Sequence, residues 1–170
     1  MAKEIHNDLE KLPEDVRWNL QRADGFLDLG MTEKARAELV RVPEPERGSC
    51  AFRLLALRLT MEECDWPRAA ELASALRETF PDEPGFWIQL AFAKRRAEGL
   101  EVARHILSDA LLRFPNVATI PFNLACYECQ LGRLDEAMHR LKQAFGLDEA
   151  CRDAALEDED LKPLWNRIGA

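Results

Sequence analysis

Small and apolar residues recur along this chain with a constant step of 34 residues. Alanine shows the step most simply, at Ala35, Ala69, Ala103 and Ala137. One such series can arise by chance in a chain rich in alanine, so a true repeat requires other positions to keep the step. Four more series keep it: Ala23, Leu57, Ala91 and Ala125; Leu39, Ala73, Leu107 and Leu141; Val42, Leu76, Ala110 and Ala144; and Thr32, Trp66, Leu100 and Leu134. Because no insertion separates the copies, the pattern predicts a helical repeat protein.

Each copy predicts two antiparallel helices joined by a short turn. In the copy at 118–151, Gly132 ends the first helix, and Asp135 and Glu136 begin the second. The helix dipole favours carboxylates in a first helical turn. The apolar residues of the second helix recur at i, i+4 and i+7: Ala137, Leu141 and Ala144. This spacing predicts one buried helix face.

The alanine series has a physical explanation in helix packing. Where two helices cross closely, a side chain larger than alanine holds the axes apart and loses contacts on both sides. We therefore expect Ala103 and Ala137 to be buried at helix crossings.

The repeat resembles the tetratricopeptide repeat (TPR), whose pattern is W-x2-L-G-x2-Y, then A-x3-F, then P. The third copy matches best, with Lys94 departing at the tyrosine position and Ala91 in place of the glycine; its matching residues are Trp87, Leu90, Ala103, Leu107, Ala110 and Pro115. The fourth copy matches in its turn, from Gly132 to Ala137. The first two copies keep the small and apolar series but carry Asn19 and Arg53 where the family has tryptophan.

The resemblance implies an all-α fold, a right-handed α-solenoid of four helix-turn-helix repeats with a C-terminal capping helix. On this interpretation a single TPR domain covers residues 1–170. It divides into an N-terminal cap at 1–15, repeats at 16–49, 50–83, 84–117 and 118–151, and a C-terminal cap at 152–170.

Both ends need a cap because repeats bury their faces only against neighbours. At the C-terminal end we expect a helical turn at 154–156, then a last helix that begins with the acidic run 157–160. The apolar residues of that helix follow i, i+3, i+4 and i+7: Leu161, Leu164, Trp165 and Ile168. The acidic run is either a docking patch for a basic partner or a solvated helix N-terminus, and the dipole favours the second. At the other end, residues 1–12 predict a short helix before Pro13, through Ile5, Leu9 and Leu12.

The resemblance also implies a concave groove, lined by the first helix of each copy, that binds a peptide or protein segment. The groove positions of the family fall on Leu20, Asp24 and Leu27 in the first copy; Leu54, Leu55, Arg58 and Met61 in the second; Ile88, Gln89, Phe92, Arg95 and Arg96 in the third; and Phe122, Asn123, Cys126 and Gln130 in the fourth.

This lining suggests a particular ligand. Some family members grip the terminal carboxylate of chaperone tails, but Leu20 and Asp24 replace the residues of that clamp, which disfavours such an adaptor. The remaining groove suits an apolar segment with an acidic residue near Arg58 and Arg95. The alternative is that Phe92 and Phe122 belong to the core and that the basic run 94–96 is a solvated surface.

Composition narrows the class of protein. A chain of 170 residues with 47% hydrophobic residues is normally one domain. The net charge of −8 argues against a nucleic-acid binder. No apolar run approaches a membrane-spanning length and no signal core follows Met1, so we expect a cytoplasmic protein without membrane insertion. Five cysteines, an odd number, fit reduced thiols better than a disulfide framework.

Motifs that carry chemistry are nearly absent. Cys126 and Cys129 form one C-x-x-C pair, which is too few ligands for a structural zinc site. A redox pair would sit at a helix start, whereas this pair falls inside a predicted helix, so we interpret both cysteines as structural. We find no phosphate-binding glycine loop, nucleophile elbow or H-E-x-x-H motif. We therefore expect no cofactor, no metal site and no catalytic residues.

Three functional classes remain open. The first is a non-catalytic protein–protein interaction module or adaptor, resembling small bacterial proteins made of little but these repeats. The second is a chaperone of secretion substrates, some of which are acidic and built from the same repeats. The third is a homo-oligomeric scaffold, in which the groove of one copy holds part of another.

Overall fold

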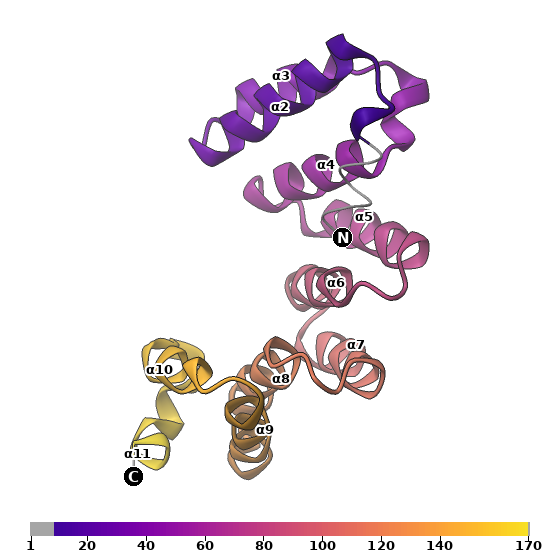
Figure 1. Ribbon diagram of the computed structural model, residues 1–170. Helices are drawn as coiled ribbons and strands as arrows, with labels where there is room; N and C mark the ends of the chain where they lie inside the picture. The colour runs from indigo at the N-terminus through magenta and orange to yellow at the C-terminus, as the bar shows by residue number, and fades with distance from the viewer. Residues whose placement is uncertain (1–8, 170) are drawn as a thin grey trace. The chain divides into compact units, whose positions relative to one another are not determined.

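The computed structural model describes residues 9–169, and these are all-α, without strands (Figure 1). The repeats contribute α2 (Glu14–Asp28), α3 (Thr32–Val40), α4 (Cys50–Glu62), α5 (Trp66–Thr79), α6 (Pro84–Ala97), α7 (Leu100–Arg113), α8 (Thr119–Gln130) and α9 (Leu134–Leu147). The second helix of each pair begins at Thr32, Trp66, Leu100 or Leu134, which is one of the series with a step of 34 residues. The all-α helical repeat fold is therefore confirmed.

The other four series form the buried face of each pair. None of their sixteen residues is more than 5% exposed, and all four members of the alanine series are fully buried. The expectation for Ala103 and Ala137 is thus met. Small side chains recur because each helix pair needs the same close approach.

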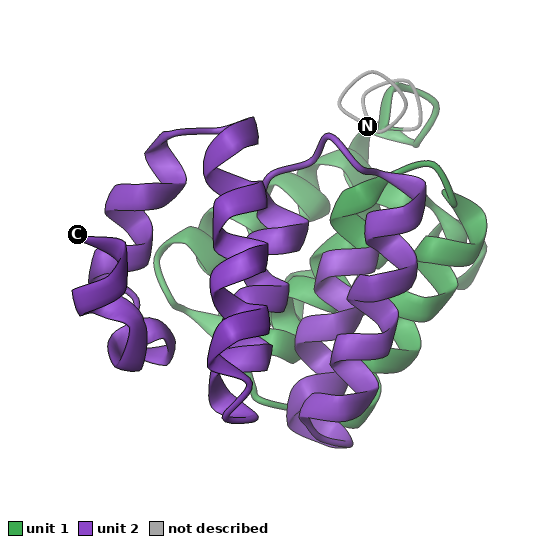
Figure 2. Cartoon of the chain, turned by 90° about the horizontal axis from the view of Figure 1, so that it is seen from below, with its two compact units in different colours: residues 1–86 green, residues 87–170 purple. Residues whose placement is uncertain are grey.

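The chain divides into two compact units, residues 1–86 and 87–170, with the boundary inside α6 (Figure 2). The four repeat boundaries, the single domain and the right-handed path of the repeats stay predictions. We describe each unit separately.

Unit 1 holds a core built by α2, α3 and α4. α2 begins directly after Pro13, and Glu14 and Asp15 occupy its first turn, where the dipole favours carboxylates. Leu9 and Leu12 pack against this core. The short helix predicted at 1–12 falls mostly on residues 1–8, among them Ile5, which lie outside the described residues. The buried core residues are Val16, Leu20, Ala23, Leu27, Ala35, Leu39, Val42, Ala51 and Leu59.

A 3-10 helix, η1 (Glu44–Gly48), joins α3 to α4 and has no counterpart in the sequence prediction. Arg47 holds it against the end of α3, donating to the carbonyl oxygens of Val42 at 2.8 Å and Val40 at 3.1 Å. Pro45 near the start of η1 cannot donate a backbone hydrogen bond, which suits a short tight turn. These contacts satisfy carbonyl groups that the last turn of α3 leaves unpaired.

Unit 2 contains α7, α8 and α9, most of α6, and a C-terminal cap. The cap consists of α10 (Ala150–Glu157), the 3-10 helix η2 (Glu159–Leu164) and the short α11 (Trp165–Ile168). Leu161, Leu164 and Ile168 are at most 3% exposed and belong to the core of this unit. Trp165 is half-buried beside them, and its indole nitrogen donates to the carbonyl oxygen of Ala155 at 3.0 Å.

The cap buries the expected apolar residues Leu161, Leu164 and Ile168, but its form differs from the sequence prediction. We expected the run 157–160 to begin one continuous last helix. Instead, the backbone of Asp158 is extended, with φ −83° and ψ 114°, and Pro163 lies inside η2. Proline lacks an amide N–H and disfavours an α conformation in the residue before it, so the segment forms a 3-10 helix and then a separate turn.

No helix within residues 9–169 combines the length and apolar character needed to cross a membrane.

Candidate functional site

In unit 1, Arg58 on α4 connects the first helices of the first two copies, α2 and α4. Its guanidinium donates to the carboxylates of Asp24, at 2.8 Å, and Asp28, at 2.7 Å, both on α2. The hydrogen bond with Asp28 is the largest cause of the raised pKa of Arg58. One positive charge faces two negative charges here, so an acidic ligand would be repelled. The predicted acidic contact at Arg58 gains no support from this geometry.

The other predicted groove residues of unit 1 differ in accessibility. Leu54 and Met61 are half-buried on α4, and Asp24 is exposed. Leu20 is only 1% exposed and belongs to the core, as does Leu27 at 3%. Leu20 is therefore not part of the candidate surface, because the side of α2 that carries it packs against the core.

In unit 2, four residues from three elements form what we call the Arg95 cluster: Arg95, Tyr127, Gln130 and Asp160. The guanidinium of Arg95 on α6 lies 2.8 Å from Gln130 Oε1 on α8 and 3.0 Å from Asp160 Oδ2 on η2. The amide nitrogen of Gln130 donates to Asp160 Oδ1. Arg95 also lies 5.2 Å from the centre of the Tyr127 ring, a cation–π contact. The cluster holds a carboxylate between a guanidinium and an amide.

Asp158 makes a second contact between the cap and α8. Its Oδ2 accepts from the thiol of Cys126 at 3.5 Å, and its Oδ1 accepts from the amide nitrogen of Asp160 at 2.9 Å. The interpretation of the acidic run as a solvated helix N-terminus is therefore wrong for Asp158 and Asp160. It failed because α8 offers partners from a distant part of the sequence.

Cys126 and Cys129 have the environment of structural cysteines. They are 3% and 5% exposed, and burial raises the pKa of both thiols, with the carboxylates of Asp158 and Asp160 adding to the effect. A raised pKa keeps both thiols protonated at neutral pH, whereas redox and metal chemistry require thiolates. Cys126 lies in the core of unit 2, so it also leaves the list of surface residues.

The two aromatic residues of the candidate groove differ: Phe122 packs against the core, whereas Phe92 is exposed. Phe122 is half-buried and packs against the core of unit 2, as does Ile88. Phe92 is 37% exposed, and the Arg96 guanidinium lies 3.7 Å from its ring centre. Gln89 and Asn123 are half-buried, and the Asn123 amide donates to the Thr119 carbonyl at 2.9 Å. Phe92, Arg96 and Asn123 therefore remain candidate surface residues.

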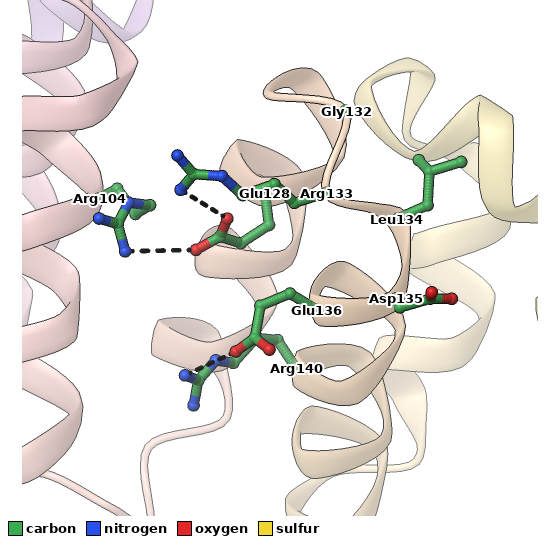
Figure 3. A pocket seen from close by; sticks show the side chains of 8 residues that line it. All are labelled: Arg104, Glu128, Gly132, Arg133, Leu134, Asp135, Glu136 and Arg140. Atoms are coloured by element: carbon green, nitrogen blue, oxygen red, sulfur yellow. Dashed lines mark hydrogen bonds and ion pairs between the residues drawn. The ribbon is translucent and has the colours of Figure 1, made fainter.

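The sequence analysis missed a polar hollow of about 490 Å³ in unit 2. At its centre, the buried carboxylate of Glu128 meets Arg104 at 3.5 Å and Arg133 at 3.3 Å (Figure 3). Glu136 and Arg140, one turn apart on α9, also line the hollow and pair at 2.9 Å (Figure 3). Arg133 also pairs with Glu101 at 2.6 Å, and the hydrogen bond from Arg104 is the largest cause of the lowered pKa of Glu101. These charges neutralise one another, so we interpret the side chains that line the hollow as a structural ion-pair network.

The sequence contained little signal for these features. Glu128 stands among apolar residues of α8, but any acidic residue in an acidic helical chain can be a surface residue. Asp158 and Asp160 belong to a run that local rules assign to solvent. No group of three histidine, cysteine, aspartate or glutamate side chains between residues 9 and 169 is arranged to hold a metal ion.

The helix pairs, the buried small residues and the cap together define a TPR-like helical repeat protein. No model of a known protein family matches the chain, and no curated protein is similar enough to match.

Solved structures identify the fold. TTC0263, a thermophilic TPR protein in Thermus thermophilus, superposes with a TM-score of 0.67 at 20% identity, covering 91% of this chain and 83% of that chain. MamA from AMB-1 gives a TM-score of 0.64 at 18% identity, with 91% and 82% covered. MamA from MSR-1 gives 0.61 at 17% identity, with 91% and 94% covered. At these identities the likeness shows the fold, which is that of TPR proteins.

Proposed function

We propose that this protein is a non-catalytic interaction module that binds a protein segment on the surface of α6 and α8, the first helices of the third and fourth copies, in unit 2. A TPR-like fold supports protein–protein interaction in general. The observation that carries the proposal is the Arg95 cluster. There, a surface formed by α6 and α8 already holds an aspartate from a distant part of the chain. Such a surface has the donors needed to bind an acidic peptide side chain.

The neighbouring side chains suit the rest of a peptide. Phe92, one turn before Arg96 on α6, exposes part of its ring, and Ile88 lies one further turn away. An apolar side chain of a ligand would contact these residues while its carboxylate approaches Arg95. We therefore propose a partner segment that combines apolar and acidic residues.

The proposal includes the absence of catalysis and a cytoplasmic location. The charged side chains of the polar hollow pair with one another, which leaves them poorly placed to act on a substrate. Burial raises the pKa of the Cys126 and Cys129 thiols, which disfavours the reactive thiolate. All five cysteines are free, which suits a reducing compartment.

Recovery of native partners by crosslinking tests the proposal. Purification of the tagged protein from its native host, followed by mass spectrometry, should identify partners that the Arg95→Glu variant loses. The matched control, Arg113→Glu, makes the same charge change at an exposed position on the second helix α7 of the same unit and should keep them. Equal recovery by Arg95→Glu and Arg113→Glu would exclude the surface of α6 and α8 as the binding site.

Light scattering completes the test. A mass above that of one 19.4 kDa chain would identify a second copy as a partner. A monomer that still captures a different protein would support an adaptor.

A further inference from the structure

The acidic run 157–160 meets unit 2 through alternate residues. Asp158 and Asp160 are half-buried, whereas Glu157 and Glu159 are exposed. Asp160 contacts Arg95 and Gln130, and Asp158 contacts Cys126. Two acidic side chains of the cap therefore occupy part of the surface that we propose for a partner.

The cap is held by two kinds of contact. Its apolar residues Leu161, Leu164 and Ile168 are at most 3% exposed and lie in the core. In the ion pair between Arg95 and Asp160, 22% of the Arg95 side chain and 29% of the Asp160 side chain are exposed, so water and a ligand can reach the pair. Partly exposed ion pairs contribute modestly to stability. The polar part of the cap can therefore leave at a lower cost than the apolar part.

The backbone supports a local displacement. The break at Asp158 ends the α-helix before the acidic contacts, and η2 is a 3-10 helix, whose hydrogen bonds have poorer geometry. A displacement of residues 158–160 breaks two backbone hydrogen bonds, from the amide of Asp158 to the Ala154 carbonyl and from the amide of Leu161 to the Asp158 carbonyl, and it leaves the rest of α10 and the buried Leu161 side chain in place.

We propose that segment 158–160 is an internal occupant of the partner site, which a partner must displace. Resting on the proposed function, this inference names the partner chemistry as an aspartate or glutamate, like Asp160, next to an apolar side chain that contacts the exposed Phe92. The carboxylate of the partner replaces that of Asp160 at Arg95 and Gln130. Residues 158–160 then move into solvent while Leu161, Leu164 and Ile168 stay buried. The internal segment lowers the affinity for every ligand that uses this site.

A peptide supplied in trans tests the proposal. The probe is a fluorescent, capped peptide with the sequence of residues 156–162, Leu-Glu-Asp-Glu-Asp-Leu-Lys, and the readout is fluorescence anisotropy with the full-length protein. The Asp160→Asn variant should bind it about tenfold more tightly than the wild type, because the internal carboxylate no longer competes; this corresponds to about 1.4 kcal/mol. The Glu157→Gln variant makes the same charge change at an exposed position and should bind like the wild type.

A second substitution tests the role of Arg95. Adding Arg95→Gln to Asp160→Asn should abolish the gain in affinity. Equal binding by the wild type and Asp160→Asn, or no binding by Asp160→Asn, would overturn the proposal. So would a gain that survives the loss of Arg95.

Hydrogen exchange of the wild type gives a measurement that needs no variant. A saturating concentration of the peptide should speed the exchange of amides at 159–161 and leave those around Leu164 unchanged. Unchanged exchange at 159–161 would contradict displacement. The outcome is separate from the partner-capture experiment: partners that Arg95→Glu loses and Arg113→Glu keeps, without any peptide effect, would refute only the internal occupant.

Discussion

At the residue scale, Cys64 adopts a backbone conformation that usually requires glycine. It lies between α4 and α5 with φ 58°, and it stands 34 residues from Gly30 and 68 from Gly132, whose φ values are 66° and 76°. A side chain in this left-handed region is strained because its Cβ approaches the following carbonyl oxygen, at a cost of roughly 1–2 kcal/mol.

The Cys64→Gly substitution should therefore stabilise the protein. The relief of strain is partly offset by the greater freedom of glycine in the unfolded chain, so we expect a net gain of about 0.5–1 kcal/mol. Urea denaturation measures it as a higher midpoint at constant slope. As a control, Gly132→Ala should lose stability by strain alone, since no atom lies within 4 Å of the added Cβ. A lower midpoint for Cys64→Gly would contradict this account of the turn.

Cys126 predicts a loss of stability in alkali. Burial raises the pKa of its thiol in the folded protein, so above the unfolded thiol pKa of about 8.5 only the unfolded chain ionises. The contribution of this group to folding is fully present below that pH and is lost as the pH rises, by at most about 1.4 kcal/mol per pH unit. Urea denaturation between pH 8 and 10 should show a shallower decline for Cys126→Ala than for the wild type. An identical decline of the unfolding free energy with pH in Cys126→Ala and the wild type would mean that the Cys126 thiol has an ordinary pKa.

At the element scale, the alanine series sets how closely the helices of a pair approach. Ala103 on α7 and Ala137 on α9 are fully buried. We expect Ala103→Leu and Ala137→Leu each to cost roughly 1–3 kcal/mol through overpacking. Ala37→Leu, at an exposed position on α3, is the matched control and should change the melting temperature little. Unchanged melting for both buried variants would refute the packing model.

Elements with a periodic pattern were predictable, and elements fixed by distant contacts were not. The starts of α3, α5, α7 and α9 follow one series, because a helix pair of constant length repeats the same packing. The 3-10 helix η1 and the broken C-terminal cap follow no period. Their form depends on prolines and on contacts such as Asp158 with Cys126, which join residues 32 positions apart.

At the scale of the whole molecule, the two compact units predict uneven stability. Repeat proteins derive stability from local interfaces, so damage in one region need not spread equally. Ala137→Leu should reduce hydrogen-exchange protection in residues 87–169 more than in residues 9–86. The wild type measured in parallel is the reference. Equal losses in both units would instead indicate one cooperative fold.

The candidate site was predictable only in part, because it depends on contacts between distant parts of the chain. Resemblance located Arg58, Arg95 and Gln130 on the first helices, but it could not reveal that Asp24, Asp28 and Asp160 already contact them. Periodicity reports which side of a helix is buried; it carries no information about which charged side chains pair across the fold. Leu20 and Cys126 show a different limit: the resemblance placed them in the groove, whereas both lie in the core.

The conformation of Cys64 also has a practical use in experiments on this protein. Of the five cysteines, it alone is exposed, while Cys50, Cys126 and Cys129 are buried and Cys151 is half-buried. A maleimide dye at neutral pH should therefore label the turn between α4 and α5 selectively. The strained turn gives the native chain a ready attachment point for fluorophores and surface tethers, without an engineered cysteine.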